Sequence, residues 1–229
     1  MKKLQTNNNS AIVFGEIGEE FEYSHEKFGE PFYQSYLRVR RLSECYDIVP
    51  ILVSGRLFDV TVPWEGRLVE IEGQYRSYNR HEGNTSHLKL VVFALEFTPF
   101  DEYPEVIANR VELDGYICQL PVFRKTPKGR EITDLMLAVN RAYCKSDYIP
   151  CICWGRTARY VARLPLGSRL QIAGRIQSRT YRKKIAEDKV IERMTFEVSI
   201  NELEYIHEHE AVGRVADYHG DYHGEGLIS

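Results

Sequence analysis

Residues 15–56, GEIGEEFEYSHEKFGEPFYQSYLRVRRLSECYDIVPILVSGR, decide the fold because the chain repeats this stretch 100 residues later. Residues 115–156 read GYICQLPVFRKTPKGREITDLMLAVNRAYCKSDYIPCICWGR, and the two segments align without a gap. The positions that are identical in both, numbered in the first segment, are Gly15, Ile17, Gly29, Leu37, Val39, Arg41, Asp47, Pro50, Gly55 and Arg56. Self-similarity at a spacing close to the size of an ordinary domain predicts two copies of one fold.

The similarity continues beyond a one-residue insertion, so that later positions correspond at a spacing of 101. Gly73 and Ser77 then match Gly174 and Ser178. We expect the first copy over residues 1–105, the second over 106–206, and a flexible tail over 207–229.

Within the second copy, apolar residues alternate with polar ones between turn signals, which is the period of half-buried strands. The residues expected to face inward are Val111, Leu113, Gly115 and Ile117 on a first strand, Leu135, Leu137 and Val139 on a second, Ile149, Cys151 and Cys153 on a third, and Leu170, Ile172 and Ile176 on a fourth. A fifth strand is expected over 195–203, and a short irregular or helical stretch over 157–165. This order predicts an all-β chain of two tandem five-stranded OB-fold barrels.

The charge of the chain is distributed unevenly. The formal net charge is −3, but residues 106–205 hold 18 Lys and Arg against 11 Asp and Glu, whereas residues 1–105 hold 11 against 17. Basic charge in one part of the chain is expected where that part meets phosphate.

The side chains expected to face outward in the second copy combine cations with flat rings. The third strand contributes Tyr148, Pro150, Ile152, Trp154 and Arg156, and the fourth contributes Arg169, Gln171, Ala173, Arg175, Gln177, Arg179 and Tyr181. The end of the second strand and the first hairpin add Tyr143, Arg124, Lys125, Lys128 and Arg130. Single-stranded nucleic acid requires cations for its phosphates and rings for its unstacked bases. The alternative interpretation is a solvated, aggregation-resistant strand surface with rings that merely pack.

The first copy lacks this combination. Ser43, Ile48 and Ser54 stand at the positions of Tyr143, Tyr148 and Trp154, and the basic stripe is replaced by a segment containing Glu70 and Glu72. Carboxylates repel phosphate. Its third strand, residues 48–53, is apolar on both faces, which predicts that both faces are covered. We therefore expect a scaffold or pairing role for the first copy, with a weaker binding contribution left open for Tyr75, Tyr78 and Arg80.

Several other classes of protein are disfavoured. The chain contains no G-x-x-x-x-G-K, H-E-x-x-H or G-x-S-x-G motif, so we expect no enzyme and no cofactor. It shows neither a signal-peptide core nor a long apolar run, which predicts a cytoplasmic, nucleoid-associated protein without a membrane partner. The five cysteines are interpreted as reduced thiols. The histidines of the tail are interpreted as part of a flexible segment, so no metal site is expected.

The second copy resembles the bacterial single-stranded DNA-binding protein (SSB) family. The resemblance rests on NRVELDGYI (109–117), TPKGREITDLMLAVNRAY (126–143), YIPCICWGRTA (148–158) and LGSRLQIAGRIQSRTY (166–181) in that order and spacing. It implies that Tyr143, Tyr148, Trp154 and Tyr181 stack on bases, and that two chains associate to give four OB-folds. The family usually has one fold per chain and a long tail with an acidic tip, which this sequence lacks. A relative of the primosomal replication proteins is therefore also considered.

These observations predict sequence-independent binding of single-stranded DNA in replication, repair or recombination, with replication or repair proteins as further partners. Two alternatives stay open, a protein-interaction scaffold of a replication or primosome assembly and a binder of single-stranded RNA.

Overall fold

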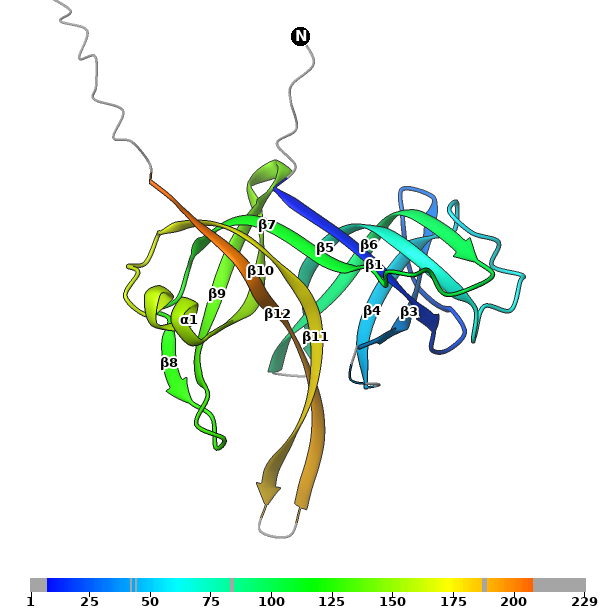
Figure 1. Ribbon diagram of the computed structural model, residues 1–229. Helices are drawn as coiled ribbons and strands as arrows, with labels where there is room; N and C mark the ends of the chain where they lie inside the picture. Colours follow the sequence, from blue (N-terminus) through cyan, green and yellow to red (C-terminus); the bar gives the residue numbers. More distant parts are fainter. Residues whose placement is uncertain (1–7, 42, 44, 83–84, 187–188, 208–229) are drawn as a thin grey trace, which may run out of the picture.

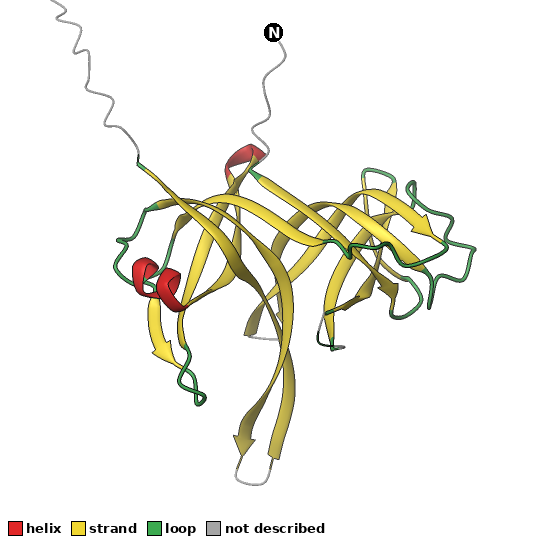
Figure 2. Cartoon of the chain, viewed as in Figure 1, coloured by secondary structure: helices red, strands yellow, loops and turns green. Residues whose placement is uncertain are grey.

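The computed structural model describes residues 8–207 except 42, 44, 83–84 and 187–188, and within strands it leaves the side chains of a few further residues undescribed. The strands of the first copy are β1 (Asn9–Ile17), β2 (Glu22–Lys27), β3 (Glu30–Arg40), β4 (Tyr46–Ser54), β5 (Leu68–Glu82) and β6 (Thr85–Phe100). The elements of the second copy are β7 (Asn109–Ile117), β8 (Val122–Lys125), β9 (Glu131–Arg141), the 3-10 helix η1 (Ala142–Cys144), β10 (Lys145–Trp154), α1 (Gly155–Val161), β11 (Arg169–Ala186) and β12 (Lys189–Ile206). The all-β prediction of two OB-folds is confirmed (Figure 2), and α1 overlaps the stretch expected to be irregular or helical.

Each copy has one more strand than expected. The segment that leads into the first hairpin turn of each copy forms a short strand of its own, β2 or β8, which pairs antiparallel with the strand that follows. A turn closes at 126–130, where the Thr126 N–H donates to the Arg130 carbonyl at 2.8 Å and Gly129 adopts a φ of 76°. A side chain on that backbone would be strained, which explains the glycine.

The predicted inward faces are confirmed on all four strands of the second copy. Leu137, Val139, Ile149 and Leu170 are fully buried, and the other predicted residues lie with them in the core. Gly174 lies at a register shift where β11 bends against β12. A Cβ atom there would lie 2.3 Å from the carbonyl oxygen of Ser199, so only glycine fits this close approach of the two strands.

The two copies join into one continuous sheet, in which β1 pairs antiparallel with β7 (Figure 1). The register places Ala11 opposite Val111, and these two residues are equivalent by the spacing of 100. The strand pair is therefore arranged around a pseudo-twofold axis that passes between them. The chain contains, in covalent form, the dimer that two separate copies would make by pairing their first strands.

None of the described residues forms a helix long and apolar enough to cross a membrane. The expected tail lies outside the described residues, apart from His207.

Candidate nucleic-acid interface

The outer face of the second copy is built by five neighbouring strands in the order β11, β12, β10, β9, β8. The registers place Arg175 opposite Ser199, Ser199 opposite Ile152, and Ile152 opposite Asp134. Residues that lie opposite one another share a face of the sheet. These four residues come from separate parts of the sequence and therefore share one face of the sheet.

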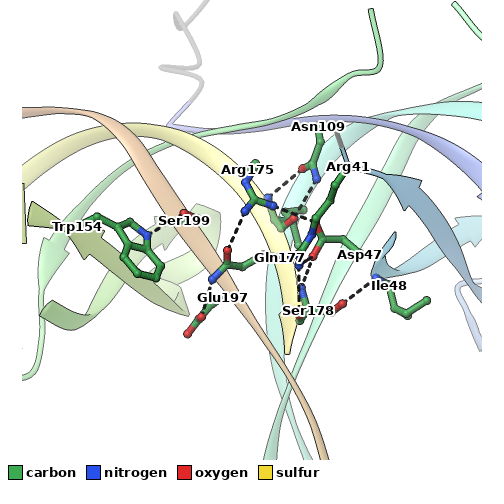
Figure 3. A network of polar contacts seen from close by, with 11 residues as sticks. Arg41, Asp47, Ile48, Asn109, Trp154, Arg175, Gln177, Ser178, Glu197 and Ser199 are labelled. Carbon is green, nitrogen blue, oxygen red and sulfur yellow. Dashed lines mark hydrogen bonds and ion pairs between the residues drawn. The ribbon is translucent and has the colours of Figure 1, made fainter. Parts of the chain in front are cut away.

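Two rings stand on this face. Tyr148 and Trp154, both on β10, are 48% and 37% exposed, large values for aromatic side chains. The indole N–H of Trp154 donates to the hydroxyl of Ser199 at 3.2 Å (Figure 3). This hydrogen bond fixes the ring against β12 while leaving part of its surface open to a stacking partner. Ile152, expected to point outward, lies between the two rings but is buried.

For the other two predicted rings, the structure describes the backbone alone. Tyr143 lies in η1, two residues beyond the end of β9, and Tyr181 lies in β11 opposite Arg193. Their side chains lie outside the described part of the structure. Their stacking role remains a prediction.

The predicted cations divide into two groups. Lys125, Lys128, Arg130 and Arg156 are exposed and make no ion pair with any described residue. The first three surround the turn between β8 and β9. Cations in this state are available to phosphate without first giving up a protein carboxylate.

The remaining arginines hold carboxylates of the protein. Arg124 donates to Asp134 at 3.0 Å, and Arg179 lies 3.6 Å from Glu197. Both arginines are still partly exposed on the outer face. A phosphate would have to share them with these carboxylates, which weakens their net attraction for it.

Arg169 lies in a different environment. It donates two hydrogen bonds of 2.9 Å to Asp114, which lowers the pKa of that carboxyl group. Gln171 also donates to Asp114, and the hollow beside them is lined by Glu112 and Glu202 among others. This end of β11 is acidic and does not extend the free cations of the β8–β9 hairpin.

Arg175 takes part in a network between the copies (Figure 3). It donates at 2.9 Å to Asp47 of the first copy, whose side chain is fully buried. The same carboxylate accepts hydrogen bonds from Arg41 and, at 2.8 Å, from the Ser178 N–H. Asp47 raises the pKa of Arg41 through their hydrogen bond. The Ser178 hydroxyl completes the network by accepting from the Ile48 N–H at 2.8 Å.

The pseudo-twofold axis repeats the network with the copies exchanged. Arg141 and Asp147 of the second copy form the ion pair, and Ser77 of the first copy takes the place of Ser178. The Ser77 hydroxyl accepts from the Tyr148 N–H at 2.8 Å, so the first copy holds the backbone beneath one of the exposed rings.

The sequence contains a pattern that indicates this network. Arg41, Asp47 and Ser77 each have an identical residue in the other copy, and the charged pair keeps its separation of six residues. Identical charged residues on a strand edge in both copies point to a shared interface, because a solvated surface would not require them.

Comparison with known proteins gives the family of the second copy. Residues 108–206 match the model of the single-strand binding protein family. The match lies wholly within the second copy. Single-stranded DNA-binding protein A of Bacillus subtilis is 39% identical over 80 residues, covering 32% of this chain and 46% of that protein. Single-stranded DNA-binding protein 2 of Listeria innocua is 38% identical over 80 residues, covering 32% of this chain and 50% of that protein. The chain thus spans about half the length of these relatives, and the resemblance to the SSB family is confirmed.

Two solved structures are also similar to this chain. The single-stranded DNA-binding protein of Thermus aquaticus is 19% identical, with a TM-score of 0.69 over 90% of this chain and 96% of that chain. At this identity the likeness shows the fold, and it extends over both copies. The N-terminal domain of PriB from Thermoanaerobacter tencongensis is 42% identical over 42% of this chain and 99% of that chain, with a TM-score of 0.37.

Proposed function

We propose that this protein binds single-stranded DNA without sequence specificity and acts in replication, repair or recombination in the cytoplasm. The observation that carries the proposal is the joint presence on the second copy of two exposed rings, Tyr148 and Trp154, and of cations that pair with no described carboxylate. Rings stack on any base and cations contact any phosphate, so neither group selects a sequence. Binding in this mode requires no catalysis and no cofactor. SSB relatives that bind single strands support the choice of ligand.

The first test is fluorescence anisotropy of labelled oligo-dT, of its duplex and of oligo-U at low and moderate salt. We expect tight binding of oligo-dT and weak binding of the duplex, because paired bases cannot reach the rings. If the four unpaired cations each contact a phosphate, log affinity falls against log salt with a slope of roughly −3. Equal or tighter binding of oligo-U would favour RNA as the ligand. Absence of all binding at low salt would favour the protein-scaffold alternative.

Trp154→Ala tests the stacking role directly. Stacking on one ring contributes about 1 to 3 kcal/mol, so the affinity for oligo-dT should fall about 5- to 150-fold. The matched control is Tyr103→Ala, because Tyr103 is a ring of similar exposure, 43%, in the segment between the copies. Equal affinities of the two variants for oligo-dT would remove Trp154 from the interface.

We further propose that two chains associate, giving four OB-folds per assembly, and that replication or repair proteins are further partners. Light scattering coupled to size exclusion should then give about twice the chain mass of 26.7 kDa. A mass of one chain in the presence and absence of oligo-dT would refute the assembly without affecting the ligand assignment.

A further inference from the structure

A cleft of about 920 Å³ lies between the two copies and is lined by none of the exposed rings and cations described above. The first copy contributes the outward side of β3 and β4, including Tyr36 and Pro50, and the second contributes Pro150 and Thr195 from β10 and β12. β10 and β12 also build the outer face of the second copy. The cleft is therefore continuous with the proposed interface. Its volume lies in the range typical of ligand sites.

The first copy lines this cleft with stacked flat groups. The ring centroids of Phe32 and Phe93 lie 5.8 Å apart, and the His25 ring stacks on Phe32 at 5.1 Å with an angle of 12° between the planes. The Arg76 guanidinium lies over Phe93, 4.1 Å from the ring centroid. A guanidinium that stacks on a ring offers its other face to a further planar group.

The first copy has no ring on β4 at the position of Trp154, but it has Phe93 nearby on β6. In the second copy, Trp154 leans on Ser199 of the neighbouring strand β12. In the first copy, Ser54 stands at the tryptophan position. β6 pairs with β4 as β12 pairs with β10, and Phe93 lies opposite Leu52 as Ser199 lies opposite Ile152. The large and small residues have exchanged strands, so an aromatic group is retained at this place in the sheet.

The charges around the cleft suit a polyanion. Lys27, Lys89 and Arg76 line it together with a single described carboxylate, Glu19, while Arg141 is neutralised by its own aspartate. Glu70 and Glu72, which argued against phosphate binding by the first copy, do not line it. Flat groups combined with unpaired cations match a single nucleic-acid strand, whereas an apolar peptide would gain little from the lysines.

We propose that this cleft binds bases of the same single strand that occupies the second copy, so that the first copy is a second binding surface and not only a scaffold. The inference rests on the proposed function. The strand would pass from the rings of β10 over Pro150 into the cleft, stack on Arg76 and Phe93, and place its phosphates near Lys89.

The test is the dependence of affinity on oligonucleotide length, measured by anisotropy with labelled oligo-dT. For the wild-type chain, affinity should rise with length until the strand spans both surfaces. Phe93→Leu keeps an apolar side chain but removes the flat ring, and Lys89→Glu reverses an exposed charge. Each variant should bind the shortest bound oligonucleotide as the wild type does, and should lose about 5-fold or more in affinity for the long one.

Arg40→Glu is the control, because Arg40 is an exposed cation of the first copy that does not line the cleft. Thermal unfolding is used to check that Phe93→Leu is folded, and Lys89→Glu replaces an exposed side chain. Ultraviolet cross-linking of the wild-type chain to oligo-dT should label a peptide from residues 85–100.

The outcomes separate the two proposals. Failure of the wild-type chain to bind any single strand overturns both. Normal binding with cross-links confined to the second copy, or with both variants equal to the wild type at every length, overturns the second surface and leaves the first intact.

Discussion

Replacing Asp47 by asparagine should destabilise the protein by removing the charge that joins the two copies. The carboxylate is fully buried and accepts hydrogen bonds from Arg41, Arg175 and the Ser178 N–H. The side-chain amide of the variant would retain a single carbonyl acceptor for these three donors. Both guanidinium groups would therefore lose their counter-charge, and at least one of the three donors would lose its acceptor.

The loss in free energy of unfolding depends on how exposed Arg41 and Arg175 are to water. Removing one partner of a buried ion pair costs about 3 to 5 kcal/mol. The side chains of Arg41 and Arg175 are 31% and 34% exposed, so water can replace part of the lost interaction. We expect a loss near the lower bound, about 3 kcal/mol, which lowers the unfolding temperature of a chain of this size by about 6 to 12 °C.

The measurement is thermal and urea unfolding followed by circular dichroism, with Asp147→Asn as the matched variant. Asp147 is equally buried and holds Arg141 and the Ser77 N–H, but no described second arginine donates a hydrogen bond to it. Its substitution should therefore cost less than that of Asp47. A loss below about 1 kcal/mol for Asp47→Asn, or a larger loss for Asp147→Asn, would refute the electrostatic reasoning.

Two further predictions concern the packing of the second copy. Gly174→Ala should lower the free energy of unfolding by about 1 to 3 kcal/mol, because the new methyl group would collide with the Ser199 carbonyl; an unchanged urea midpoint would contradict the close approach of β11 and β12. Burial raises the pKa of Cys153 to about 12, so its thiol should not react with a disulfide reagent at pH 8 in the native protein, whereas exposed Cys45 and Cys144 should react at once. Rapid native labelling of Cys153, detected by peptide mass spectrometry, would show that the core of this copy opens.

The fold could be predicted because each of its signals is local or periodic. The repeat gave two copies, and the alternation of apolar residues gave the inward faces. The same alternation of inward and outward residues, followed along β5, shows that one expectation was wrong. Tyr75, considered as a weak binding residue, continues the inward series of Val69 and Ile71 and is fully buried, which raises the pKa of its hydroxyl. Tyr78 has the opposite parity and is 47% exposed.

The state of the arginines could not be predicted, because their partners come from other strands. Arg175 holds a carboxylate of the other copy, and Arg169 holds Asp114 of the neighbouring strand β7. Strand periodicity gives the face on which a side chain lies but not the charges that meet it.

The expected cover of the third strand of the first copy was also wrong. Its outward residues Ile48, Pro50 and Leu52 are only half-buried and line the cleft between the copies. An apolar strand has the same sequence pattern whether another layer of the protein covers it or it lines a cleft.

Joining the two copies in one chain frees equivalent positions to diverge. Gln74 and Arg76 on β5 correspond to Arg175 and Gln177 on β11, so the arginine and glutamine have exchanged places across the pseudo-twofold axis. In both copies the arginine donates to its glutamine, but one guanidinium stacks on Phe93 and the other holds the buried Asp47. A homodimer of single copies would carry the same residue on both sides of its axis. The fused chain can instead use one arginine to line a surface and the equivalent one to fix how the two surfaces lie together.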